Sequence, residues 1–185
     1  MESESRWLQR WIPTLLGVLG GAAAAAFPDH WGFSLALCAL AIGSALLIPV
    51  DLAEFRLPDL IVWPMTTAVL GVLLVTTAVT GEWPRFSTAL LAMLAVGGGY
   101  FVLAWISPTS MGLGDVKLSL VLGLTLGWFG WQTVAYGIVA GFIVFALLAL
   151  VMLALRRTSA KSDLAFGPSM IVGAAIGLAW VALTR

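Results

Sequence analysis

Residues 134–155, VAYGIVAGFIVFALLALVMLAL, run for 22 positions without a charged side chain. A helix that crosses the hydrocarbon core of a bilayer needs about 20 mostly apolar residues. Arg156 and Arg157 follow the run at once and mark its end. The stretch therefore predicts a transmembrane helix, and the chain around it has the same character.

The whole chain is strongly apolar, with 61% hydrophobic residues, 10% charged residues and a mean hydropathy of +1.06. A soluble domain of 185 residues would need far more polar surface to cover its core. No long charged or Ser/Pro-rich stretch is present, so we expect one membrane-embedded domain over residues 1–185. The net charge of zero and the scattered basic residues argue against nucleic acid as a partner.

Short polar or Pro/Gly-bearing breaks divide the chain into seven apolar stretches. The sequence thus predicts an all-α, polytopic membrane protein with seven transmembrane helices. Arg6 and Arg10 precede an apolar run with a small-residue end, a pattern that also resembles a cleavable signal, whose removal would leave six. The fifth stretch is short, and its helix could begin at Gly112. The predicted spans are Trp11 to Phe27, Trp31 to Val50, Leu60 to Thr80, Phe86 to Ser107, Val116 to Phe129, Val134 to Leu155 and Gly167 to Leu183.

Basic and aromatic residues near the span ends indicate how the chain is oriented. With the N-terminus in the cytoplasm, seven Lys and Arg residues lie on inner segments and two on outer ones, which is the bias that cytoplasmic loops show. Indoles prefer the headgroup region, so tryptophans at span ends are expected to be anchors. These tryptophans are Trp7, Trp11, Trp31, Trp83, Trp128 and Trp131. The inner basic residues are Arg6, Arg10, Arg56, Lys117, Arg156, Arg157 and Lys161, and the outer ones are Arg85 and Arg185.

Two carboxylates interrupt the apolar sequence on the predicted cytoplasmic side. Asp51 follows Ile48-Pro49-Val50, and Asp115 lies within the segment MGLGDVKL, residues 111–118. Ionisable groups at membrane depth are costly, so they point to function. Two predicted spans separate these aspartates, which places them at the same membrane face. We therefore expect the two carboxylates to meet.

Two carboxylates in close contact share one proton, as in the aspartic proteases. The ionised member can activate a water molecule while the protonated member donates to the carbonyl under attack. This chemistry needs no metal, cofactor or covalent intermediate, and we predict none. The single histidine, His30, falls on the outer face and the single cysteine, Cys38, has no nearby base, so a Cys or Ser nucleophile would lack activation.

The sequence around each aspartate predicts which one carries the proton. Asp115 is expected in the first turn of a helix, where the macrodipole favours the ionised form. Asp51 has apolar neighbours that favour the protonated form. The alternative for Asp115 is a purely structural helix cap. Gly112 and Gly114 are expected to accept unusual backbone angles and to leave room for an extended substrate strand.

These landmarks together resemble the type IV prepilin peptidase family of membrane aspartyl proteases, in the short form that lacks a cytoplasmic Cys-x-x-Cys domain. The family shows an Asp followed by Leu-Pro-Asp, matched by DLAEFRLPD at residues 51–59. Its Gly-x-Gly-Asp-x-Lys element is matched at residues 112–117, and its late Phe-Gly-Pro segment at residues 166–168. Presenilin-like and signal-peptide-peptidase-like proteases share the Gly-x-Gly-Asp element, whereas the spacing to Leu-Pro-Asp is more selective.

The resemblance implies that Asp51 and Asp115 are the catalytic pair. It implies a prepilin or pseudopilin substrate with a short basic leader, a cleavage point after Gly and a transmembrane N-terminal helix. The expected location is the inner membrane of a prokaryote, with several spans, lipid contact and an active site that faces the cytoplasm. Larger family members carry paired Cys-x-x-Cys motifs and some methylate the new N-terminus, but this sequence offers neither those motifs nor a methyl-donor loop.

Other residues of these motifs have two interpretations each. Asp59 could cap the third helix or contact substrate, and Glu54 could share a helical face with Asp51 or be a solvated charge. Lys117 could anchor at the interface or recognise an acidic group of the substrate. Gly167 and Pro168 could form a helix start with proline in the first turn, although the resemblance places them near the active-site face.

Two other classes of function remain open at this point. A signal-peptide-peptidase-like enzyme would use the same pair on a bond in mid-membrane, but its first Asp commonly follows a Tyr, and here Val50 precedes Asp51. A small cation or proton transporter could use Asp51, Glu54 and Asp115 as a path. The sequence shows no obvious inverted repeat in support of transport.

Overall fold

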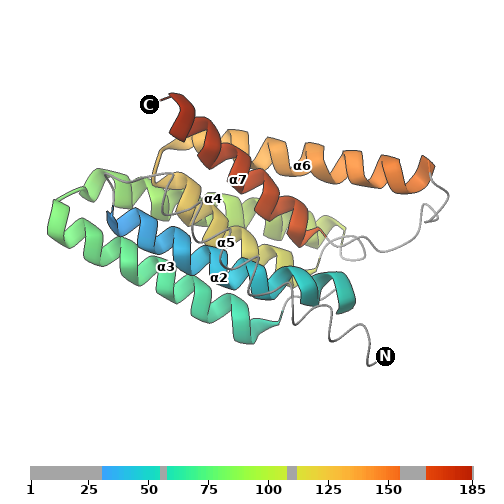
Figure 1. Ribbon diagram of the computed structural model, residues 1–185, viewed down its shortest axis with the longest axis horizontal. Helices are drawn as coiled ribbons and strands as arrows, with labels where there is room; N and C mark the ends of the chain where they lie inside the picture. The colour runs from blue at the N-terminus through green and yellow to red at the C-terminus, as the bar shows by residue number, and fades with distance from the viewer. Residues whose placement is uncertain (1–30, 55–57, 108–111, 155–165, 185) are drawn as a thin grey trace.

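The computed structural model describes residues 31–54, 58–107, 112–154 and 166–184, and this part of the chain folds into helices. The first predicted span, Trp11 to Phe27, and the signal-peptide alternative lie outside the described residues. Figure 1 shows the helices as a bundle in which helices that follow one another in the sequence pack side by side. The helices are α2 (Trp31–Glu54), α3 (Asp59–Thr80), α4 (Trp83–Ile106), α5 (Leu113–Gly127), α6 (Trp131–Ala154) and α7 (Gly167–Thr184).

Five of these six described helices are long and apolar enough to cross a membrane, namely α2, α3, α4, α6 and α7. The all-helical, multi-pass prediction is confirmed for this part of the chain, but seven spanning helices are not. The stretch predicted as the fifth span forms α5, which has 15 residues and is roughly 22 Å long at 1.5 Å per residue. That length falls short of the roughly 30 Å hydrocarbon core.

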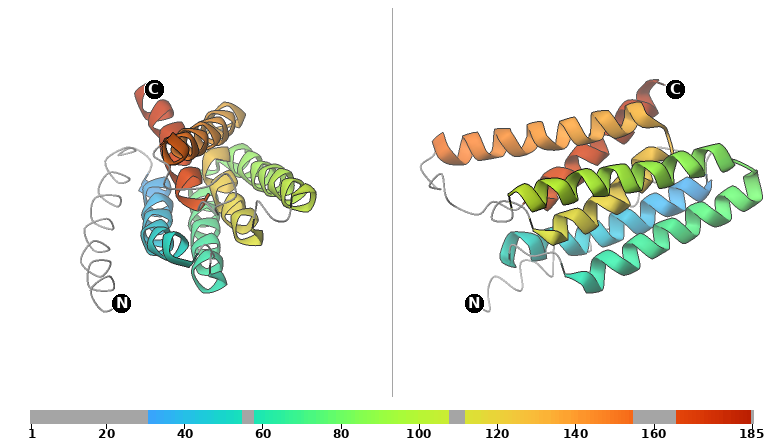
Figure 2. Two further views of the ribbon diagram at one scale, coloured as in Figure 1. Left: turned by 90° about the vertical axis from the view of Figure 1, so that its right-hand side faces the viewer. Right: turned by 180° about the vertical axis from the view of Figure 1, so that it is seen from behind.

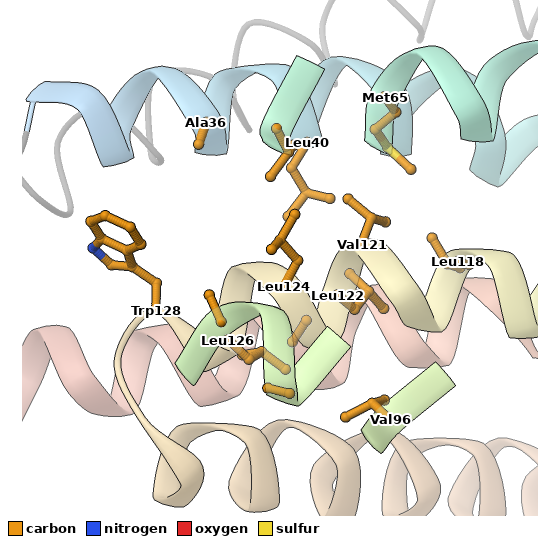
Figure 3. Packing of buried hydrophobic residues seen from close by; sticks show 14 of the residues in the cluster. Ala36, Leu40, Met65, Val96, Leu118, Val121, Leu122, Leu124, Leu126 and Trp128 are labelled. Carbon is orange, nitrogen blue, oxygen red and sulfur yellow. The ribbon is translucent and has the colours of Figure 1, made fainter. Parts of the chain in front are cut away.

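The short helix α5 lies at the centre of the bundle. It packs most extensively against α4 and also contacts α3, α6 and α7, and every residue from Val121 to Trp128 is buried. The two views of Figure 2 show α5 surrounded by longer helices. Figure 3 shows side chains of α5, among them Val121 and Leu124, filling the space toward its neighbours. A helix wrapped in protein does not have to match the bilayer thickness, which explains why α5 is short.

The four predicted anchor tryptophans that lie in the described residues divide into two groups. Trp31, Trp83 and Trp131 each stand at the first residue of a helix and are about half exposed, in agreement with an interfacial position. Trp128 is 2% exposed and stacks on Phe33. Its predicted interfacial position is therefore wrong, because it follows α5 rather than a lipid-facing span.

Helices α6 and α7 touch through their backbones near one end. A Cβ atom on Gly173 would lie 2.4 Å from the backbone N of Gly141 and 2.5 Å from the carbonyl O of Gly137. Small residues allow transmembrane helices to approach this closely. Toward Ala154 the two helices diverge, as Figures 1 and 2 show. Of the five candidate spans, α6 is the least buried.

Candidate active site

Asp51 lies in the last turn of α2. The structure extends this helix to Glu54, one turn beyond the predicted end at Val50, so the aspartate is held on helical backbone rather than in a loop. Its side chain is 3% exposed, and one carboxylate oxygen, Oδ2, is buried without a hydrogen-bond partner. Burial raises the pKa of Asp51, and a hydrogen bond from the Gly167 backbone acts in the opposite direction.

Asp115 is the third residue of α5, whose N-terminal cap is Gly112. The Gly112 N–H donates to Oδ2 of Asp115 over 3.2 Å, while the Asp115 N–H donates to the Gly112 carbonyl over 3.1 Å. The carboxylate therefore does satisfy a helix-start amide, from the third position rather than from the cap position. The capping interpretation is thus correct in part. The hydrogen bond occupies Oδ2, so the other carboxylate oxygen, Oδ1, is left for a second role.

The two aspartates interact electrostatically. Burial, together with the negative charge of Asp51, raises the pKa of Asp115 to about 6, and the hydrogen bond from Gly112 lowers it in part. A raised pKa at Asp115 argues against the predicted preference for its ionised form, because burial disfavours the charge. Burial raises the pKa of both carboxyl groups, so which of the two carries a shared proton stays a prediction.

Three helix ends meet at this pair. Gly167 is the first residue of α7, and Pro168 follows in the first turn, as predicted for a proline at a helix start. The first backbone N–H groups of a helix have no partner within it, which leaves the Gly167 amide free to face Asp51. The Phe-Gly-Pro segment therefore lies beside Asp51, as the sequence resemblance implied.

Gly112 and Gly114 do not require glycine for their backbone angles. Gly112 has φ −80° and ψ 153°, and Gly114 is helical. A Cβ atom on Gly112 would lie 3.8 Å from the backbone N of Gly114 and 3.9 Å from Oδ2 of Asp115, in ordinary van der Waals contact. The predicted use of unusual backbone angles is wrong for these two residues. The expected room for a substrate strand stays a prediction.

Lys117 and Asp59 form an ion pair that neither interpretation of the sequence included. The cap of α3 is Pro58, so the capping prediction for Asp59 is wrong, and Asp59 is instead the first helical residue. The pair joins the start of α3 to the second turn of α5, and the Asp59 side chain is 62% exposed. Lys117 thus points away from Asp115, as expected for a residue two positions along a helix.

Two further predictions concern Glu54 and metal ligands. Glu54 is the last residue of α2, and its side chain lies outside the part of the chain that the structure describes. In the described ranges, no three His, Cys, Asp or Glu side chains gather as a potential metal site.

Sequence reasoning missed Tyr100 of α4. Its side chain is 5% exposed and lies within electrostatic range of Asp115. Its ring also packs against Phe166, the residue before Gly167. The available signal was a single phenol in an apolar span that directly precedes the Gly-Leu-Gly-Asp segment.

Comparison with known proteins decides the family. The sequence model of the type IV leader peptidase family matches residues 38–156, which include Asp51, Tyr100, Asp115 and Lys117. The chain belongs to the type IV leader peptidase family. The buried aspartate pair therefore lies within the leader peptidase region of the chain, and Gly167 lies just beyond it.

Several curated relatives of this leader peptidase family member are named prepilin leader peptidase/N-methyltransferase. The chain is 28% identical over 175 residues to the one from Stutzerimonas stutzeri, covering 89% of this chain and 55% of that protein. It is 28% identical over 162 residues to the one from Pseudomonas aeruginosa, covering 82% of this chain and 52% of that protein. The chain thus spans about half the length of these relatives. No solved structure matches it significantly.

Proposed function

We propose that this chain is a membrane aspartyl endopeptidase that removes the leader of type IV prepilins, with Asp51 and Asp115 as its catalytic pair. The observation that carries the proposal is the pairing of two buried carboxylates from distant parts of a leader peptidase family chain. Perturbed carboxylate pairs are a recurrent feature of active sites. The proposal concerns the peptidase activity named for the relatives and takes no position on their N-methyltransferase activity.

We also propose a role for each aspartate. Asp115, whose pKa is raised to about 6, keeps its proton and acts as general acid, and Asp51 acts as general base. A water molecule between them gives a proton to Asp51 as its oxygen attacks the carbonyl carbon of the peptide bond. Asp115 donates its proton to the carbonyl oxygen as that carbon becomes tetrahedral. The C–N bond then breaks, the new amine takes the proton from Asp51, and Asp115 regains its own from the collapsing intermediate.

The position of the pair favours a bond at the membrane boundary. Asp51 lies in the last turn of a spanning helix, after the apolar window Trp31–Ile48, and Asp115 lies in the first turn of α5. A bond in mid-bilayer would need carboxylates deeper in these helices, so the signal-peptide-peptidase-like alternative is less well supported. The excess of basic residues on the same side supports a cytoplasmic active site in the inner membrane of a bacterium.

The substrate class follows from this position. A prepilin presents a short basic leader on the cytoplasmic side and continues as an apolar helix in the membrane. The scissile bond has to leave the helical conformation before water can reach it, and glycine before that bond makes unwinding easier. We place the extended segment of the substrate beside Gly112 at the start of α5, whose amide donates to Asp115.

The test is co-expression with a tagged prepilin, followed by mass determination of the product. The wild type is compared with Asp51→Asn and Asp115→Asn, and Asp59→Asn is the control because Asp59 pairs with Lys117 outside the aspartate pair. The proposal is supported if the prepilin loses its leader with the wild type and with Asp59→Asn. It must keep its leader with both active-site variants. Cleavage by both active-site variants would overturn it. A wild type that leaves the prepilin intact but moves protons in vesicles would favour the transporter.

A further inference from the structure

Tyr100 lies between the Phe166–Gly167 segment beside Asp51 and the helix α5 that carries Asp115. It stands on α4, is buried, and faces the side of the bundle that holds α5 and α7. The other tyrosine of the chain, Tyr136, is 47% exposed on α6 and packs against Trp180. The two phenols therefore have very different surroundings, which makes Tyr136 a natural reference for Tyr100.

The ring of Tyr100 belongs to a cluster of four aromatic side chains. Its centroid lies 5.9 Å from that of Phe142 and 6.1 Å from that of Phe166. Phe166 also packs on Phe142 at 5.4 Å and edge-on against Phe145 at 4.9 Å. Such ring pairs contribute about 0.5–1.5 kcal/mol each beyond the burial of area. The cluster thus fixes Phe166, and with it Gly167, whose backbone bonds to Asp51.

The same side chain reaches the region of Asp115. Tyr100 and Ser119 line one small cavity of about 10 Å³, together with Met170 of α7. Ser119 follows Asp115 by four residues and so lies one turn further along the same face of α5. Tyr100 also lies within electrostatic range of the Asp115 carboxylate. One residue therefore contacts the element that carries Asp115 and the segment that bonds to Asp51.

We propose that Tyr100 is a positioning residue of the peptidase, whose ring holds Phe166–Gly167 against Asp51 and whose hydroxyl orients the carboxyl group of Asp115. The inference rests on the proposed function, since it concerns how the aspartate pair is held for the reaction. Tyr100 transfers no proton in this scheme. It acts through the two aspartates.

The helices that the structure describes bring few charges toward Tyr100, which simplifies the expected effect of its hydroxyl. Helices α6 and α7 bring no ionisable side chain except Tyr136. From α5 come Asp115 and Lys117, and Lys117 is paired with Asp59 of α3. Asp51 faces Asp115 from α2, and Arg85 of α4 is paired with Glu82 at the far end of that helix. A neutral phenol that donates toward a carboxylate favours its ionised form, so removing the hydroxyl is expected to raise the pKa of Asp115.

The experiment measures cleavage of a purified prepilin by the full-length enzyme in detergent over a range of pH. Tyr100→Phe keeps the ring and removes the hydroxyl, and Tyr136→Phe is the matched control. We expect Tyr100→Phe to lower kcat about tenfold, to leave KM nearly unchanged and to move the alkaline limb of the pH profile upward by about half a unit. Tyr136→Phe should match the wild type. Tyr100→Leu, which also removes the ring, should lower kcat further.

The outcomes separate this inference from the proposed function. If Tyr100→Phe and Tyr100→Leu both follow the wild-type pH profile and rate, the positioning role is wrong while the peptidase assignment stands. If Tyr100→Phe loses activity without any shift of the profile, the orienting role of the hydroxyl is wrong. If the wild type itself does not cut the prepilin, the proposed function fails, and this inference fails with it.

Discussion

The aspartate site and the α6–α7 contact are two regions of close packing built on opposite principles. The site holds two buried carboxylates, one of which has an oxygen without a partner, and burying such groups costs stability. The α6–α7 contact holds no charge and brings Gly173 against the backbone of Gly141 and Gly137. The first region holds the polar groups that the proposed reaction requires, and the second serves to hold helices together. Substitutions should therefore separate activity from stability.

The largest effect is expected at the site, on activity alone. Asp51→Asn or Asp115→Asn should lower the rate of prepilin cleavage by more than about 10³-fold, because an amide can replace neither the base nor the acid. The thermal unfolding midpoint should stay the same or rise, since an amide cannot ionise and so removes the cost of burying two interacting carboxyl groups. Cleavage assays and unfolding in detergent on the same preparations test both statements. A variant that is inactive because it unfolds would contradict the second.

The glycine contact should show the opposite behaviour. Gly173→Ala places a methyl group within 2.4 Å of backbone N, so α6 and α7 must separate, and we expect a loss of roughly 2–3 kcal/mol in the free energy of unfolding. Activity per folded molecule should remain. Gly71→Ala is the control, because a Cβ atom there meets nothing within 4 Å and alanine is the better helix former. Equal destabilisation by both substitutions would show that packing at Gly173 is not the cause.

The pH dependence of stability sharpens the comparison further. The pKa of Asp115 is raised from 3.8 to about 6 in the folded protein, so the native state holds a proton that the unfolded state releases. Stability is then greatest below pH 3.8 and falls as pH rises to about 6, by an amount on the order of 2–3 kcal/mol from this group. Unfolding midpoints between these values, for the wild type and Asp115→Asn, test this. The variant should show a flatter curve, and an identical slope would refute the assignment.

The smallest effect is expected at the ion pair between Lys117 and Asp59. The Asp59 side chain is 62% exposed, and exposed pairs contribute at most about 1 kcal/mol. Asp59→Asn should therefore change the unfolding midpoint little and the cleavage rate by less than about threefold. Measurement at low and high salt checks the cause, since screening should remove the difference. A loss of activity as large as that of the aspartate variants would make Asp59 part of the site.

The sequence predicted those features that depend on hydropathy and on helix-start chemistry. It placed four of the five spanning helices within about three residues of their observed ends, and it brought Asp51 and Asp115 to one face. It did not distinguish α5 from a lipid-facing span, because hydropathy reports that a residue avoids water and not whether lipid or protein surrounds it. Trp128 was misplaced for the same reason.

The details of the site depend on contacts between distant segments. Tyr100, Gly167 and Asp51 lie on three different helices, and they come together because Tyr100 packs on Phe166 and α7 packs on α2. The pKa of each aspartate also depends on burial, which no local pattern records. Local rules favoured an ionised Asp115, whereas burial among the enclosing helices raises its pKa.

The central position of α5 shields it from changes in the thickness of the surrounding bilayer. A lipid-facing helix tilts or shifts when the hydrocarbon thickness changes, whereas α5 contacts protein along nearly its whole length. The depth of Asp115 is therefore set by the neighbouring helices rather than by acyl chains. Membranes of different thickness should change how the outer helices tilt while Asp115 keeps its place relative to the protein that encloses it.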